Sequence, residues 1–235
     1  MDLMHVHNKF RYFIAKGDFN HIGLKNTPAA NMHVLSYSKQ LEFSAGCWAR
    51  QCRKDHSGCR AVKEDILGEI VCSQEHIDLD DSLLHITSLR LLKACLEEKV
   101  RKSRINFTHS VIDSLQFPSG HTGLINLDAL QIMWADTRYV GCSRVKFQHP
   151  TPSRMVFLQV CHYFPRANSM KHPIFVRGEP TSKCQHGESA TPQYSTLCGD
   201  IRPIKLDNWQ AMKGNRNTWG FILSLHLLYL QYIFR

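Results

Sequence analysis

Two runs of strand-forming residues, each carrying a cysteine, constrain the fold of this chain more than any other feature. The run Tyr139 to Phe147 contains Cys142, and the run Met155 to Tyr163 contains Cys161. Both are rich in β-branched and aromatic residues, and the Pro-containing turn His149 to Pro152 joins them. The pattern predicts an antiparallel hairpin, on which a disulfide between Cys142 and Cys161 is geometrically reasonable.

Helical spacing of apolar residues marks the rest of the domain. It predicts helices over residues 6–14, 41–52, 84–102 and 127–134. Gly17 ends the first of these, and the segment Asp78 to Ser82 offers an N-terminal cap to the third. The 235 residues, with 43% hydrophobic and 21% charged residues, suit one globular domain with a substantial core.

The chain carries a net positive charge, but its basic residues are not clustered in the sequence. The formal net charge is +9, yet the Lys and Arg residues are scattered and form no basic run interleaved with aromatic residues. We therefore expect a basic surface and no nucleic-acid partner.

Nine cysteines indicate an oxidising compartment. Because nine is odd, at least one thiol stays free or pairs outside the chain. The triplet beginning at Asn106 is an acceptor for N-glycosylation and agrees with secretion. The segment Met1 to Ala15 does not behave as a signal peptide, because polar residues interrupt every apolar run.

The C-terminal segment Trp219 to Phe234 is strongly apolar but shorter than the ~20 residues that span a bilayer. A membrane anchor, a lipid-anchor signal, a packed helix and a gene-model artefact remain the alternatives. We favour an extension outside the domain and expect no membrane partner.

Two ordered motifs resemble those of a known superfamily. They are Trp-Ala-Asp-Thr-x-x-Val-Gly-Cys at Trp134 to Cys142, and Val-Cys-His-Tyr-Phe-Pro-x-x-Asn at Val160 to Asn168. This pair resembles the signatures of the CAP superfamily, which comprises cysteine-rich secretory proteins, antigen-five venom allergens and plant pathogenesis-related proteins. Short motifs in the segment Pro173 to Cys198 resemble the C-terminal end of the insect venom-allergen-like branch. The resemblance spans residues 4 to 199.

The resemblance implies an α+β fold: a three-layer α-β-α sandwich with a small antiparallel sheet. We expect a CAP (SCP) domain over residues 1–199 that lacks its natural N terminus, and a C-terminal extension over residues 200–235. The expected disulfides join Cys52 with Cys59, Cys142 with Cys161, and Cys184 with Cys198. Cys47, Cys72 and Cys95 are left over, and we expect them to be buried thiols. A zinc knuckle made of Cys47, Cys52, His56 and Cys59 is the rival interpretation, although its spacing fits no standard finger.

The superfamily builds a cavity from two histidines and two acidic residues, which in several members holds a divalent metal. Carried over by position, the cavity here consists of His56, Glu69, Glu98 and Asp128, with Asp128 in place of the second histidine. His56 and Glu69 are the expected metal ligands, and one imidazole with three carboxylates favours oxygen-loving ions over zinc. His121 in the adjacent loop is a substitute ligand by proximity alone. No other cofactor is expected.

The resemblance implies a secreted, extracellular, non-enzymatic protein that binds a lipid, a sterol or a protein partner. The alternative is a metal-dependent hydrolase that uses the four cavity residues. Ser57, beside His56, superficially offers a nucleophile, but adjacent residues cannot readily point at each other as a triad requires. Ion-channel modulation is a third hypothesis, and the chain lacks the compact cysteine-rich C-terminal domain of the relatives that perform it.

Overall fold

The computed structural model describes most of the domain. The described residues are 3–19, 24–57, 61–62, 65–76, 84–103, 107–115, 127–148, 155–167 and 172–202. Several predicted features lie outside them: Cys59, the capping segment 78–82, Asn106, His121 and the apolar tail.

A four-stranded sheet forms the centre of the molecule, with the strand order β1-β5-β6-β4. Strands β5 (Tyr139–Gln148) and β6 (Met155–Phe164) pair antiparallel, so the predicted hairpin is confirmed. Strand β4 (Gly68–His76) pairs antiparallel with the other edge of β6. The two-residue strand β1 (Ser36–Tyr37) pairs with β5 in parallel, which is the one parallel pairing within this sheet.

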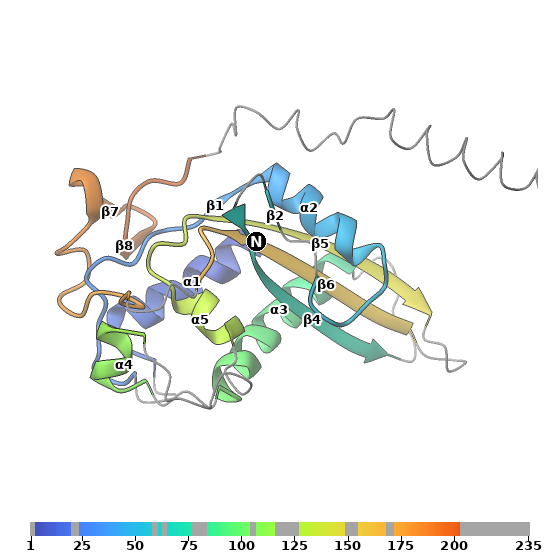
Figure 1. The fold of residues 1–235 in the computed structure, drawn as a ribbon, viewed down its shortest axis with the longest axis horizontal. Coiled ribbons are helices and arrows are strands. Elements are labelled where there is room, and N and C mark those ends of the chain that lie inside the picture. The colour runs from blue at the N-terminus through green and yellow to red at the C-terminus, as the bar shows by residue number, and fades with distance from the viewer. Residues whose placement is uncertain are drawn as a thin grey trace, which may run out of the picture.

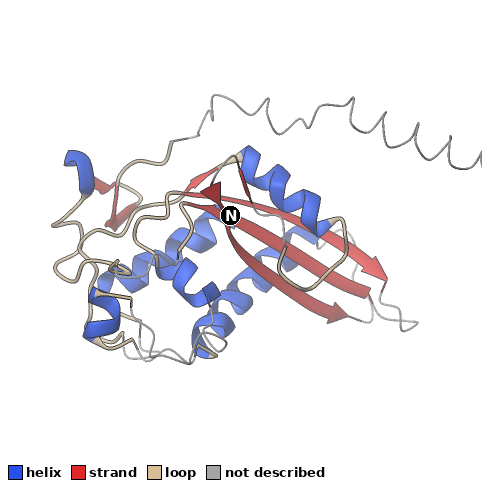
Figure 2. Ribbon diagram, in the orientation of Figure 1, coloured by secondary structure: helices blue, strands red, loops and turns tan. Residues whose placement is uncertain are grey.

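Helices cover both faces of this sheet, as Figure 1 shows. Helix α2 (Lys39–Ala49) packs on one face, against β5 and β6. Helices α1 (Leu3–Lys16), α3 (Leu84–Arg101) and α5 (Leu127–Met133) lie on the opposite face. The fold is therefore the predicted three-layer α-β-α sandwich (Figure 2). None of the described helices is both long and apolar enough to cross a membrane.

Short elements complete the described fold. Strands β2 (Ala61–Val62) and β3 (Asp65–Ile66) form one small ladder, and β7 (Ala190–Thr191) and β8 (Tyr194–Cys198) form another. The remaining short helices are α4 (His109–Asp113) and the 3-10 turn η2 (Gln185–Gly187).

The middle strand β6 is buried on both faces. All of its residues except the two terminal ones are buried, which explains why its sequence reads as a nearly continuous apolar run. Gly141 allows α2 to approach the neighbouring strand β5: a Cβ atom there would lie 2.2 Å from the Glu42 backbone nitrogen. The glycine of the Val-Gly-Cys motif is thus required by close packing of a helix on the sheet.

Arg11 links α1 to the rest of the domain from a fully buried position. Its side chain is 1% exposed and donates five hydrogen bonds to backbone carbonyls, of His33 (2.9 Å), Ile132 (3.1 Å), Trp134 (2.8 Å), Ala135 (3.0 Å) and Thr137 (3.3 Å). Burial lowers the pKa of Arg11 to about 9. Arg11 therefore has a structural role: it donates to buried backbone carbonyls, two of which, those of Trp134 and Ala135, also accept a hydrogen bond from a backbone N–H.

Two of the three expected disulfides are present. Cys142 and Cys161 are directly opposite each other on β5 and β6, and Cys184 is bonded to Cys198.

The other cysteines correct our expectations. Cys72 and Cys95 are not unpaired thiols, because β4 packs against α3 and brings their Cα atoms to 5.8 Å, where they form a third disulfide. Cys47 and Cys52 carry free, exposed thiols. Because the Cys52 thiol is free, it does not form the expected bond to Cys59, a residue that lies outside the described ranges.

Candidate functional site

Three of the four predicted cavity residues meet at one end of the sheet. His56 lies in the loop after α2, Glu69 in β4, and Asp128 in the first turn of α5. The imidazole of His56 bridges the two carboxylates, with Nδ1 2.9 Å from Glu69 Oε1 and Nε2 3.5 Å from Asp128 Oδ1. Both carboxylates are buried, with side chains 0% and 6% exposed, whereas His56 is 47% exposed.

Glu98 is not part of this cluster, contrary to the prediction. Its side chain is 51% exposed and forms an ion pair with Lys102, the residue that follows the end of α3. The next residue, Lys99, turns toward the cluster instead, and its Nζ lies 2.7 Å from Asp128 Oδ2. A cation therefore faces Asp128 from the helix that was expected to supply a carboxylate.

His162 completes the cluster and was missed by the sequence analysis. It is directly opposite Glu69 in the register of β4 and β6. Its Nε2 lies 2.9 Å from Glu69 Oε2, and its Nδ1 lies 3.0 Å from Ser44 Oγ on α2. The available signal was a histidine in the second motif, but its partner strand β4 was not predicted.

Glu69 is the electrostatic centre of the cluster. Burial raises the pKa of its carboxyl group, but hydrogen bonds from His162, from His56 and from the Ser57 backbone N–H (2.8 Å) outweigh that effect and lower the pKa to about 2. Glu69 is therefore a carboxylate throughout the physiological range of pH.

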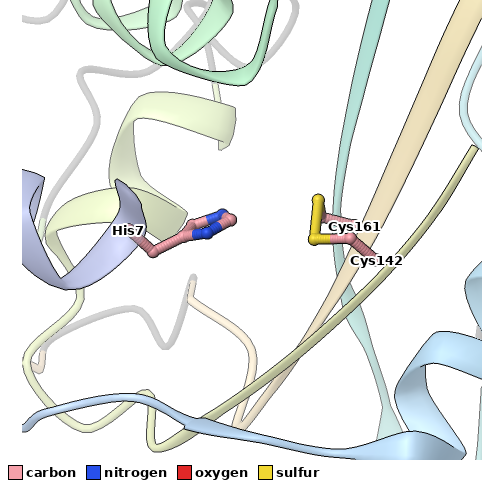
Figure 3. A group of neighbouring side chains, drawn as sticks. All are labelled: His7, Cys142 and Cys161. Carbon is pink, nitrogen blue, oxygen red and sulfur yellow. A yellow bond between two sulfur atoms is a disulfide. The ribbon is translucent and has the colours of Figure 1, made fainter. Parts of the chain in front are cut away.

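The arrangement does not fit a metal ion. Imidazole and carboxylate are suitable donor types, but the two carboxylates already hold His56, His162 and Lys99. Among the described residues, one group of three candidate ligands lies within 4.8 Å of one another: His7, Cys142 and Cys161. Figure 3 shows that the two sulfur atoms of that group are bonded to each other. Neither sulfur is a thiolate, so that group is not a metal site either.

A groove with an apolar floor lies between α1 and α3. Its volume is about 920 Å³. Its apolar lining consists of Val6, Phe10, Phe13, Phe19 and Ala94, and its charged lining consists of Lys9, Asp18, Lys93, Glu97, Glu98 and Arg101. Glu98, expected in the metal cavity, is on the wall of this groove.

The charges of the groove are not equivalent. Each acidic residue is paired: Asp18 with Lys16 (2.7 Å), Glu97 with Lys93 (3.8 Å), and Glu98 with Lys102. Lys9 and Arg101 are exposed and have no ion-pair partner among the described residues. The groove thus combines an apolar floor with two free cations.

A second, polar pocket of about 510 Å³ lies beside the β7-β8 ladder, and the sequence analysis did not predict it. On its wall, the Arg138 guanidinium contacts Glu188 Oε1 (3.0 Å) and His33 Nε2 (3.1 Å). His33 Nδ1 lies 3.1 Å from Glu188 Oε2. Burial and the nearby Arg138 lower the pKa of His33 to about 4, although Glu188 opposes the shift. Since Arg138 can only donate, His33 is neutral with its proton on Nδ1.

Comparison with known proteins shows which family this chain matches and which relatives it is similar to. Residues 4–163 match the family model described as CAP: Cysteine-rich secretory protein family. Venom allergen 3 of Solenopsis invicta is 27% identical over 175 residues, which cover 74% of this chain and 70% of the relative. Scoloptoxin SSD43 of Scolopendra dehaani is 26% identical over 195 residues, which cover 82% of this chain and 80% of the relative.

A solved structure shows the same fold. The crystal structure of NaASP2 with Zn²⁺ has a TM-score of 0.61 and 24% identity, and the match covers 83% of this chain and 92% of that chain.

Proposed function

Because the chain belongs to the CAP family of cysteine-rich secretory proteins, in its venom-allergen-like branch, we propose that it is a secreted, non-enzymatic protein that binds an acidic lipid in extracellular fluid. The α1–α3 groove is the proposed binding site. Its volume and apolar floor are the observations that carry the proposal. Insect origin stays a prediction.

Size and lining favour a lipid chain. The volume of about 920 Å³ lies within the range of roughly 300–1,000 Å³ that is typical of small-molecule sites. Phe10 and Val6 are buried, and Phe13 is 39% exposed, so the floor offers aromatic and aliphatic contacts to a ligand. Each methylene group of an acyl chain that leaves water contributes about 0.8 kcal/mol.

The free cations select the head group. Lys9 and Arg101 stand at the groove without a partner among the described residues, and a carboxylate or phosphate would supply one. A sterol, whose hydroxyl group is neutral, would leave both cations unused. We therefore favour an anionic lipid over a sterol, and a lipid over a protein partner.

Secretion is supported by the three disulfides, because such bonds persist in oxidising compartments. The non-enzymatic assignment is supported by the His56 cluster, in which Glu98 does not join the other three predicted residues. The hydrolase alternative required all four to converge on one cavity.

The test is displacement of a fluorescent fatty-acid probe by palmitate from the full chain, produced in the secretory pathway of cultured cells. We expect saturable displacement by palmitate and weaker displacement by cholesterol. Ala94→Trp fills the groove and should abolish binding, while Ala190→Trp, exposed on β7 outside the groove, should leave it unchanged. Wild-type protein that binds no probe, or an Ala94→Trp variant that binds as well as wild type, would contradict the proposal.

A double variant of the two cations tests the preference for an anionic head group separately. Replacing both Lys9 and Arg101 with Gln should weaken palmitate binding by up to roughly fivefold for each ion pair lost, since an exposed ion pair contributes up to ~1 kcal/mol. Binding of the neutral hexadecanol should not change. The matched control replaces Lys25 and Arg90, which are exposed and do not line the groove. An equal loss of affinity for palmitate and hexadecanol would show that the two cations do not recognise the charge of the head group.

A further inference from the structure

The His56 cluster contains two buried carboxylates that must be neutralised. The Glu69 side chain is 0% exposed and that of Asp128 is 6% exposed. An isolated buried carboxylate is strongly unfavourable, so each needs a cation or several hydrogen-bond donors. Glu69 obtains them from His56, His162 and the Ser57 backbone N–H.

Asp128 obtains its positive partner from α3. Its Oδ2 lies 2.7 Å from the ammonium group of Lys99, while its Oδ1 lies 3.5 Å from His56. The Lys99 side chain is 29% exposed, so its charge is partly removed from water beside Asp128. We infer that Lys99 is a tethered cation that takes the place of a divalent metal ion in this cluster and keeps such ions out.

The neighbouring residue on α3 supports this assignment. Consecutive helical residues are rotated by about 100°, so Glu98 and Lys99 cannot both point at the cluster. Glu98 points to the α1–α3 groove and pairs with Lys102. The rotation of α3 thus presents an ammonium group where a carboxylate would have added a metal ligand.

Charge decides what the cluster can bind. Carboxylates and imidazoles are donor types that bind divalent first-row ions, although no three of the described donors of this cluster lie within 4.8 Å of one another. A divalent ion ~4 Å from an ammonium group is repelled by about 2 kcal/mol even in bulk water, which corresponds to a roughly 30-fold loss of affinity. The loss is larger where water is excluded. Removing the ammonium group should therefore raise the affinity of the cluster for a divalent ion.

The test is calorimetric titration of the metal-free full chain with Zn²⁺ at pH 7. Lys99→Met keeps the length of the side chain and removes the charge, and we expect it to bind one Zn²⁺ at least ~30-fold more tightly than wild type. Lys99→Arg keeps a cation and should bind no better than wild type. Lys93→Met is the matched control, because Lys93 is on the same helix, 69% exposed, and paired with Glu97 away from the cluster.

Two further variants locate the gained site. Adding Asp128→Asn or His56→Gln to Lys99→Met should abolish the gain, whereas zinc bound by the exposed thiols of Cys47 and Cys52 would remain. Circular dichroism confirms that each variant is folded, and Lys99→Gln replaces Lys99→Met if that variant is not. The inference is overturned if wild type already binds Zn²⁺ through Asp128, or if neither folded uncharged variant binds Zn²⁺ more tightly than wild type.

Discussion

Glu69→Gln is the substitution whose effect on stability the structure predicts most fully. The folded-state pKa of Glu69 is about 2, against an ordinary value of 4.5. Because the folded pKa is depressed, the carboxylate stabilises the fold above pH 4.5, and that stabilisation is lost as the pH falls toward 2. The difference of 2.5 pKa units corresponds to about 3 kcal/mol, and the side chain is fully buried, so solvent does not screen it.

The assay is urea unfolding of wild type and Glu69→Gln, followed by tryptophan fluorescence between pH 7 and pH 3. We expect the variant to be less stable by about 3 kcal/mol at pH 7, and this deficit to shrink by about 2 kcal/mol at pH 3. The exposed Glu179→Gln variant is the control and should follow wild type throughout. A Glu69→Gln deficit that is independent of pH would refute the proposed hydrogen-bond network around the carboxylate.

Three other predictions concern the scaffold. Arg11→Lys should destabilise the fold by about 2 kcal/mol or more in urea unfolding, since an ammonium group has three donors for the five carbonyls that Arg11 reaches; a loss below about 0.5 kcal/mol would contradict this role. His33→Gln should make the free energy of unfolding less dependent on pH between 6.5 and 4. The pKa of His33 in the folded protein is about 4, so as the pH falls through this window the unfolded chain binds the proton first and wild type loses stability. An unchanged pH dependence in the variant would contradict the lowered pKa. Replacing Cys72 and Cys95 with Ala should lower stability by roughly 2–4 kcal/mol, and peptide mapping of the wild type that finds either thiol free would contradict the disulfide.

The sequence predicted those parts of the fold whose determinants are local. The hairpin of β5 and β6 followed from two adjacent strand-forming runs, and its disulfide followed from the register that a short turn allows. Helix α1 followed from apolar spacing and the stop at Gly17. In each case the interacting residues are close along the chain, or the pattern is periodic.

The missed parts depend on contacts between distant segments. His162 reaches Glu69 only because β4 pairs with β6 in a register that joins residues 93 positions apart. The Cys72–Cys95 bond likewise depends on α3 packing against β4. The motif predicted Glu98 in the cluster, but Lys99 contacts it instead. A sequence motif gives only the position of a residue along the chain. The rotation of the helix decides which of two neighbouring side chains points toward the sheet.

The most direct test of the account is native mass spectrometry of the full chain, purified without chelators from the secretory pathway of cultured cells and measured before and after denaturation. The account predicts a non-covalent adduct with the mass of an acidic lipid, lost on denaturation and absent from Ala94→Trp, and no bound zinc in wild type. A wild-type protein that carries one zinc ion and no lipid would contradict both the proposed groove ligand and the role of Lys99.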